Sequence, residues 1–153
     1  MIIVWEPQCI GSSHEAVNAG LLAAVQAGNP NEETVFVSDP SHGQAVSNLL
    51  MARGEPVPRL IGIKTGNPDL FLQNLATAVR FFVALRKIQP KKGRKKLLVA
   101  TGHSFTGLWL LLMSALHLSD GDIFVAWHSQ LNSLVESRRK RPFEKFLPHI
   151  LKN

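Results

Sequence analysis

The feature that most constrains this 153-residue chain is a recurring order of strand, polar turn and helix. The first instance spans residues 2–28. Residues 2–5 (IIVW) form a short apolar run with β-branched residues, typical of a strand buried on both faces. A glycine- and serine-containing turn follows, and small and apolar residues then recur at helical spacing up to the stop signal at Gly28. One such unit predicts a strand followed by a helix.

The same order continues to about residue 127. We expect strands at residues 2–5, 34–38, 59–64, 97–100 and 123–127, and helices at residues 13–28, 44–53, 69–88 and 108–118. Alternation of this kind predicts an α/β fold. The expected architecture is a single Rossmann-like domain over residues 1–153, with a mostly parallel sheet of about five or more strands and helices on both faces.

The first turn is a candidate ligand site. Gly11, Ser12 and Ser13 supply a flexible turn, and Glu15 follows Ser12 at capping-box spacing, so a helix start near Ser13 is expected. Such a start places free backbone N–H groups and a partial positive charge beside Ser12, Ser13 and His14, which suits a phosphate or a sugar hydroxyl. The alternative is that a strand-to-helix turn needs glycine and serine for its geometry alone.

Polar residues also follow the other expected strands, where ligands gather in parallel sheets. They are Ser12, Ser13 and His14 after the first strand, Ser41 and His42 after the second, Gly102, His103 and Ser104 after the fourth, and His128 and Gln130 after the fifth. Four of the six histidines therefore follow strands. Any one of them could instead be a turn or capping residue.

Composition limits the setting. The single cysteine, Cys9, excludes an internal disulfide, and there is no cysteine cluster of zinc-site type, so a reducing, cytoplasmic location is expected. Neither a metal nor a cofactor is expected. No segment reaches the roughly 18 uninterrupted apolar residues of a membrane span, and no basic leader precedes the first strand.

The 17 Lys and Arg residues exceed the 11 Asp and Glu residues, and the excess lies in residues 91–96 and 137–145. Solvated loops and helix faces explain such runs, while anionic lipid or nucleic acid is the alternative. Nucleic acid is disfavoured because Phe143 and Phe146 are the only aromatic residues near the second run. Residues 69–88 are unusually apolar; burial against the sheet is expected, with contact to a membrane surface or a partner as the alternative.

One enzymatic interpretation places a nucleophile at Ser104. Gly102, His103 and Ser104 resemble the strand-to-helix turn that carries the serine of α/β-hydrolases. Phe105 and Thr106 follow without the glycine that this motif expects, and no glycine run for an oxyanion loop is visible.

A second interpretation rests on a resemblance along most of the chain. Gly11 and His14 resemble a first glycine-containing loop ending in histidine, Gly102, Ser104 and Gly107 a second loop, and His128, Gln130 and Asn132 a later histidine-containing segment. In this order they look like the acceptor-side, N-terminal half of a GT-B glycosyltransferase, loosely similar to the N-acetylglucosaminyltransferases that act on lipid-linked acceptors.

The resemblance implies a domain that binds the acceptor while a sugar is transferred from a nucleotide-sugar donor in glycan or polysaccharide synthesis. It implies His14 as the catalytic residue. The implied substrate-binding residues are Gly11, Ser12, Ser13, Gly102, His103, Ser104, His128, Gln130 and Asn132. A C-terminal half or a partner subunit would bring the donor, so the chain alone would be inactive. A peripheral position on an anionic inner membrane face would suit a lipid-linked acceptor.

A third class stays open at this point. A basic doubly wound domain can bind a nucleotide, a nucleic acid or another protein without catalysis, and fold alone does not decide between these functions.

Overall fold

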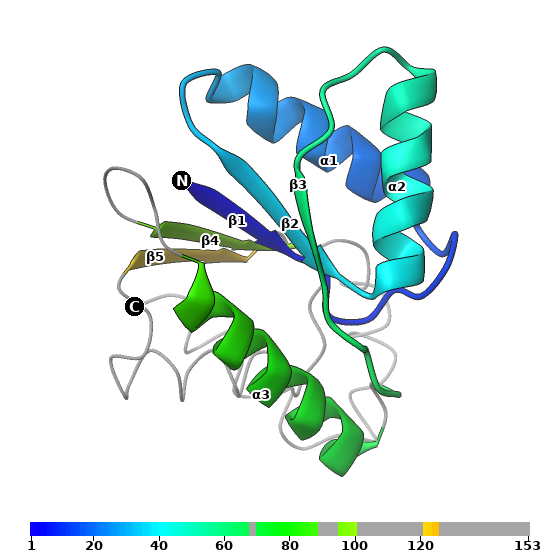
Figure 1. The fold of residues 1–153 in the computed structure, drawn as a ribbon, viewed down its shortest axis with the longest axis vertical. Coiled ribbons are helices and arrows are strands. Elements are labelled where there is room, and N and C mark those ends of the chain that lie inside the picture. The colour runs from blue at the N-terminus through cyan, green and yellow to red at the C-terminus, as the bar shows by residue number, and fades with distance from the viewer. Residues whose placement is uncertain (68–69, 89–94, 101–120, 126–153) are drawn as a thin grey trace, which may run out of the picture.

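The computed structural model describes residues 1–67, 70–88, 95–100 and 121–125 (Figure 1). Its strands form one sheet in which every described pair is parallel. The strands are β1 (Ile2–Trp5), β2 (Thr34–Ser38), β3 (Arg59–Gly62), β4 (Lys95–Val99) and β5 (Gly121–Val125). Their order is β3-β2-β1-β4-β5. The predicted α/β class with a parallel sheet is confirmed for this part of the chain.

The central strand is β1, which pairs with β2 on one side and β4 on the other. Val4 lies opposite Phe36 of β2 and Leu98 of β4. The chain moves outward from β1 to β3 and then returns to β4, so the direction of winding reverses between β1 and β4. In open parallel sheets the crevice outside the carboxyl ends of the strands at such a reversal is where ligands bind.

Helices cover both faces of the sheet (Figure 1). Helices α1 (Glu15–Gly28) and α2 (Pro40–Ala52) lie on one face and α3 (Phe71–Lys87) on the other. The side chains of β1 alternate accordingly: Val4 belongs to the core under α1 and α2, and Trp5 to the core under α3. Trp5 stacks on Phe81 of α3 with ring centroids 3.9 Å apart. The prediction that residues 2–5 are buried on both faces is therefore confirmed.

Two helix starts differ from the sequence prediction. Helix α1 begins at Glu15 instead of near Ser13. Helix α2 begins at Pro40, so the residues before Gln44 that were expected to form a turn are its first turn. The reason is Asp39, whose side chain accepts a hydrogen bond from the Ser41 backbone N–H at 3.0 Å, followed by a proline at the first helical position.

Helix α3 corrects a further prediction. It begins at Phe71 instead of residue 69, and only part of its apolar surface is buried. Phe81 and Leu85 pack against the sheet, whereas Leu72, Val79 and Val83 are exposed. Among the helices that the structure describes, none has the length and hydrophobicity to cross a membrane. The helix expected at residues 108–118 and most of both basic runs lie outside the described residues.

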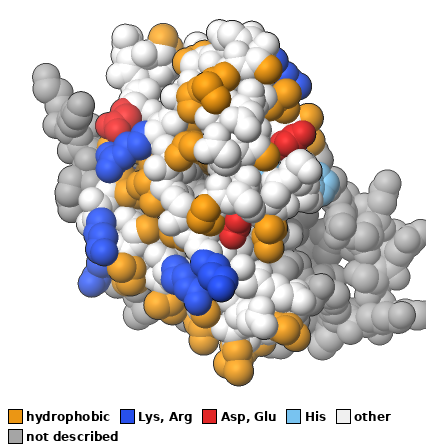
Figure 2. All heavy atoms as spheres, turned by 45° about the vertical axis from the view of Figure 1, so that its right-hand side comes forward, with side chains coloured by type: hydrophobic (Ala, Val, Ile, Leu, Met, Phe, Trp, Pro, Cys, Tyr) orange, Lys and Arg blue, Asp and Glu red, His pale blue; other side chains and the backbone are white. Residues whose placement is uncertain are grey.

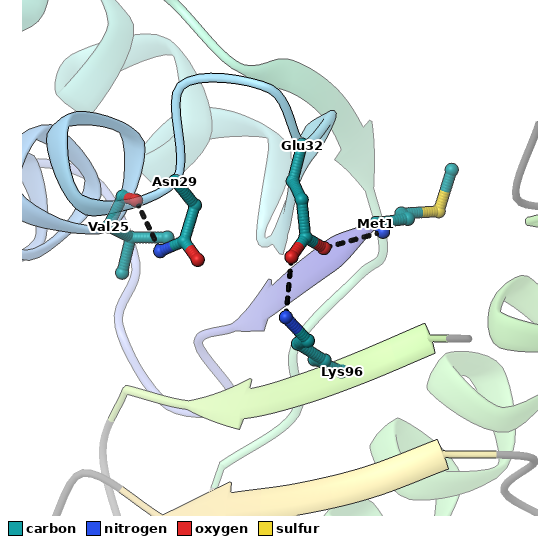
Figure 3. A network of polar contacts seen from close by, with 5 residues as sticks. All are labelled: Met1, Val25, Asn29, Glu32 and Lys96. Carbon is teal, nitrogen blue, oxygen red and sulfur yellow. Dashed lines mark hydrogen bonds and ion pairs between the residues drawn. The ribbon is translucent and has the colours of Figure 1, made fainter. Parts of the chain in front are cut away.

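At the amino ends of the strands, Glu32 joins two neighbours (Figure 3). Its Oε2 atom accepts from the amino group of Met1 at 2.9 Å, and its Oε1 atom accepts from Nζ of Lys96, the residue that follows the first position of β4. The hydrogen bond from Lys96, and then that from the Met1 amino group, lower the pKa of Glu32. This ionic contact fixes the end of the sheet opposite to the candidate site.

Candidate functional site

The loop between β1 and α1 is the candidate site, and it follows the carboxyl end of the central strand. Gly11 is half-buried, and Ser12, Ser13 and His14 are exposed. Three of the four predicted residues in this loop therefore present polar side chains to solvent at the point where the winding of the sheet reverses.

The loop meets α1 in a way that the sequence did not predict. His14 occupies the N-cap position, two residues after the Ser12 of the expected capping box, with φ 57° and ψ 19°, and its side chain makes no capping hydrogen bond. The expected capping box is wrong, because the Glu15 N–H is directed at the backbone carbonyl of Ser12 at 3.3 Å. Gly11 also has a positive φ, of 60°. Left-handed residues thus bracket Ser12 and Ser13, and at His14 this conformation is uncommon for a residue with a Cβ.

Helix α2 holds the loop through the backbone N–H and carbonyl groups of Gly11. The Gly11 N–H donates to Oγ of Ser41 at 3.0 Å, and Nδ1 of His42 lies 2.7 Å from the Gly11 carbonyl oxygen. A carbonyl oxygen only accepts, so Nδ1 carries the proton in this contact. The His42 ring is fully buried. The prediction that Ser41 and His42 lie in a turn before the helix is wrong. Both belong to the first turn of α2, from which they hold Gly11.

A buried polar network continues from His42 into the centre of the domain. With Nδ1 protonated, Nε2 of His42 accepts from Nδ2 of Asn18 at 2.9 Å. The same Nδ2 atom donates its second hydrogen to Oε2 of Glu6 at 3.1 Å. Glu6 is completely buried and its Oε1 atom accepts from the backbone N–H groups of Gln8 and Cys9, at 2.9 and 3.2 Å. The start and the end of the loop are thereby tied to one another.

Cys9 is part of this buried layer and is chemically quiet. Burial, and then the charge of Glu6 and a hydrogen bond to it, raise the pKa of the thiol to about 12, against opposing hydrogen bonds from Ser13 and Asn18. The thiolate is the reactive form of cysteine. At neutral pH Cys9 is therefore a packed, protonated side chain and no nucleophile.

Asp39 connects the loop after β2 to the loop after β3. Its Oδ2 atom accepts from the Thr65 N–H at 3.3 Å, and its Oδ1 atom accepts from the Ser41 hydroxyl at 2.7 Å. Burial alone would raise the pKa of Asp39, but the hydrogen bonds from Ser41, Thr65 and the backbone of His42 outweigh it and lower the pKa. The loops after β1, β2 and β3 are thus joined by one hydrogen-bond network through Ser41 and Asp39.

The remaining predicted site residues lie outside the described part of the chain: Gly102, His103, Ser104, His128, Gln130 and Asn132. The structure adds Glu6, Asn18 and Asp39, which the sequence analysis missed. Two signals were available. Asp39 before Pro40 is an N-cap followed by proline, and Asn18 stands among the small and apolar residues of α1, where a polar side chain needs a buried partner.

The exposed part of the loop offers two hydroxyls and an imidazole, and the buried residues beneath it are already hydrogen-bonded to one another. Such groups can bind hydroxyl or phosphate oxygens, and an imidazole can also accept a proton from a hydroxyl. Among the described residues, no group of three or more His, Cys, Asp or Glu side chains is arranged to hold a metal ion. Comparison of the chain with protein families, curated proteins and solved structures found no match.

Proposed function

We propose that the chain is the acceptor-binding domain of a GT-B type glycosyltransferase, which transfers a sugar from a nucleotide-sugar donor to a free or lipid-linked saccharide acceptor. The observation that carries the proposal is the exposed Ser12, Ser13 and His14 segment on a fixed base at the carboxyl end of the central parallel strand. Acceptor sites need preorganised polar groups, because a group held in place loses little entropy on binding.

The loop geometry supports a hydroxylated or phosphorylated acceptor. Ser12 and Ser13 can donate to and accept from sugar hydroxyls. His14 lies at the N-terminus of the 14-residue helix α1, where the helix dipole favours anionic groups. In this proposal His14 either accepts the proton of the attacking acceptor hydroxyl or donates a hydrogen bond to an acceptor phosphate.

The proposal assigns donor binding to a C-terminal domain or a partner subunit, because in GT-B enzymes the nucleotide-sugar lies mainly against the second half. Glycosyl transfer then requires both halves to close on the substrates. The chain alone is expected to bind acceptor without turnover, and to do so in the cytoplasm.

A nucleotide-binding domain without catalysis is the second candidate, since the same crevice binds nucleotides in other doubly wound sheets. The observation in its favour is the position of the loop at the reversal of winding. Against it, residues 6–14 lack the G-x-G-x-x-G spacing that lets the backbone approach a pyrophosphate closely. The hydrolase interpretation depends on Ser104 and stays a prediction outside the described residues.

A titration of isotope-labelled protein followed by amide NMR tests the proposal. The probes are N-acetylglucosamine 1-phosphate, a short-chain polyprenyl diphosphate saccharide, and UDP-N-acetylglucosamine. We expect the first two to shift the amides of residues 11–14, and the Ser12→Ala and His14→Ala variants to weaken binding. Asn31→Ala, an exposed change near the opposite end of the sheet, is the matched control. Shifts caused by the nucleotide-sugar alone would favour the nucleotide-binding alternative, and no shift at residues 11–14 with any probe would overturn both.

A further inference from the structure

Helix α3 has an apolar outer face, which is unusual for a helix that also packs on a sheet. Leu72, Val79 and Val83 are 75%, 52% and 47% exposed, and their spacing of seven and four residues places them on one line along the helix. Phe81 and Leu85 occupy the opposite, buried side. The outer line is therefore apolar surface that the described residues leave open to solvent.

Positive charges flank this line. The sequence of α3 contains no Asp or Glu, and its basic residues are Arg80, Arg86 and Lys87. Arg86 lies over the ring of Phe82 at 4.7 Å from the ring centroid, so part of its charge faces an aromatic surface. Arg80 and Lys87, one on each side of Val83 in the sequence, extend the cationic side of the helix.

A pocket of about 290 Å³ lies between this helix and the edge strand β3. Its polar lining is cationic, from Arg59, Arg80 and Lys87, and its apolar lining includes Ile61, Val83 and Ile88. None of the described residues that line it is acidic. Figure 2 shows groups of Lys and Arg side chains separated by hydrophobic ones on the face that carries β3.

The cations of the pocket are held only loosely by the protein. Arg59 has a carboxylate neighbour, Glu33, at 3.6 Å, and the two side chains are 56% and 34% exposed, so solvent screens this long ion pair and it contributes little. Arg80, which lines the pocket, donates through Nη1 to the Lys64 carbonyl oxygen at 2.9 Å, and no salt bridge joins it to an acidic side chain of the described residues. The site is therefore complementary to an anion attached to an apolar group.

We infer that α3 and the β3 edge form a docking surface for an anionic phospholipid bilayer, with a headgroup phosphate in the pocket lined by Arg59, Arg80 and Lys87. Leu72, Val79 and Val83 then enter the boundary between headgroups and acyl chains, as the apolar faces of interfacial helices do. A helix of 17 residues extends about 26 Å, enough to lie along several headgroups. Aliphatic side chains in line with the cations favour lipid over nucleic acid, whose binding relies on aromatic stacking.

Vesicle co-sedimentation tests this inference with the full chain. The vesicles are phosphatidylcholine alone, or phosphatidylcholine with 30% phosphatidylglycerol, and glycerol 1-phosphate serves as a soluble competitor. We expect binding only to the anionic vesicles. Because one Lys or Arg near an anionic surface contributes about 1 kcal/mol, Lys87→Gln should weaken partitioning about fivefold. Arg53→Gln, an equal change of charge at the end of α2 on the other face of the sheet, should change it by less than twofold.

A second pair of variants tests the apolar contribution. Val83→Ser should weaken binding to the anionic vesicles by about tenfold, since it removes an exposed aliphatic group from the interface. Met51→Ser is its control, because Met51 is 56% exposed on α2. Equal loss in the Lys87 and Arg53 variants, equal loss in the Val83 and Met51 variants, or binding of glycerol phosphate without binding of vesicles would each overturn the inference. Saccharide binding at residues 11–14 is independent of all four changes, so the two proposals fail separately.

Discussion

The imidazole of His42 lies 2.7 Å from the carbonyl oxygen of Gly11, so the first turn of α2 determines the conformation of the loop that follows β1. The two residues are 31 positions apart in the sequence. This contact explains how a loop with exposed Ser12, Ser13 and His14 keeps one shape, because both backbone groups of its glycine are held by the first turn of α2, through the exposed Ser41 and the buried His42.

His42→Ala should therefore lower stability strongly. It removes a fully buried ring and leaves the Gly11 carbonyl and one hydrogen of Asn18 without partners. Losses of this kind cost about 2–4 kcal/mol, which for a chain of this size lowers the melting temperature by roughly 5–12 °C. Thermal unfolding followed by circular dichroism measures it.

His42→Asn is the matched variant, because its amide can donate to Gly11 near the position of Nδ1. It should recover part of the lost stability. A His42→Ala protein that melts within 1 °C of the wild type would show that the contact between His42 and Gly11 does not stabilise the fold.

The high pKa of Cys9 gives an alkaline signature. The folded-state pKa of about 12 lies above the ordinary value of 9.0, so folding favours the protonated thiol. Its contribution to stability is fully present below pH 9 and is lost as the pH rises toward 12. The free energy of unfolding of the wild type, measured by urea denaturation, should thus fall faster between pH 9 and 11 than that of Cys9→Ala, by at most about 1.4 kcal/mol per pH unit.

The same thiol should react slowly with iodoacetamide at pH 8 in the folded protein and rapidly in 8 M urea. Fast alkylation of the native protein would contradict both the burial of Cys9 and its protonated state. In the urea denaturation experiment, comparison with Cys9→Ala removes the contribution of lysines, which titrate in the same pH range.

Glu32 gives the opposite, acidic signature. Its pKa is lowered by Lys96 and by the amino group of Met1, so its contribution to stability is present above its ordinary value of 4.5 and is lost as the pH falls through the lower folded-state value. Glu32→Gln should be less stable than the wild type at pH 7. The difference between their urea midpoints should shrink as the pH falls below 4.5. Glu55→Gln, an exposed change in the turn after α2, should show no such dependence.

The sequence predicted the parallel sheet well because buried strands have a simple signature. In β1 and β2 every position is buried, so continuous apolar runs reveal them without any knowledge of their neighbours. The start of α2 was missed since Ser41, His42 and Gly43 are turn formers by composition, whereas the Asp39 cap and Pro40 override that preference.

The candidate site divides in the same way. The exposed residues of the loop were found from their position after a strand, which is a local property. The buried polar network beneath them was not found, because Glu6, Asn18 and His42 are separated by 12 and 24 residues and meet only when α1 and α2 pack side by side. Isolated polar residues in apolar segments gave the sole sequence signal for that network.

His14 separates function from stability, because its backbone is left-handed at φ 57°. A residue with a Cβ pays for this conformation and glycine does not, so His14→Gly should raise the free energy of unfolding by about 1 kcal/mol. If His14 is the general base or a phosphate ligand in the proposed glycosyltransferase, the same variant should lower turnover of the assembled enzyme by about 10²-fold or more.

Gly11→Ala is the control for backbone strain, since Gly11 has φ 60° with open space around its Cβ position. The free energy of unfolding of this variant should fall by about 1 kcal/mol. A His14→Gly protein that is less stable than the wild type and fully active would make His14 a structural residue, and the catalytic group would then have to be sought at His103, Ser104 or His128.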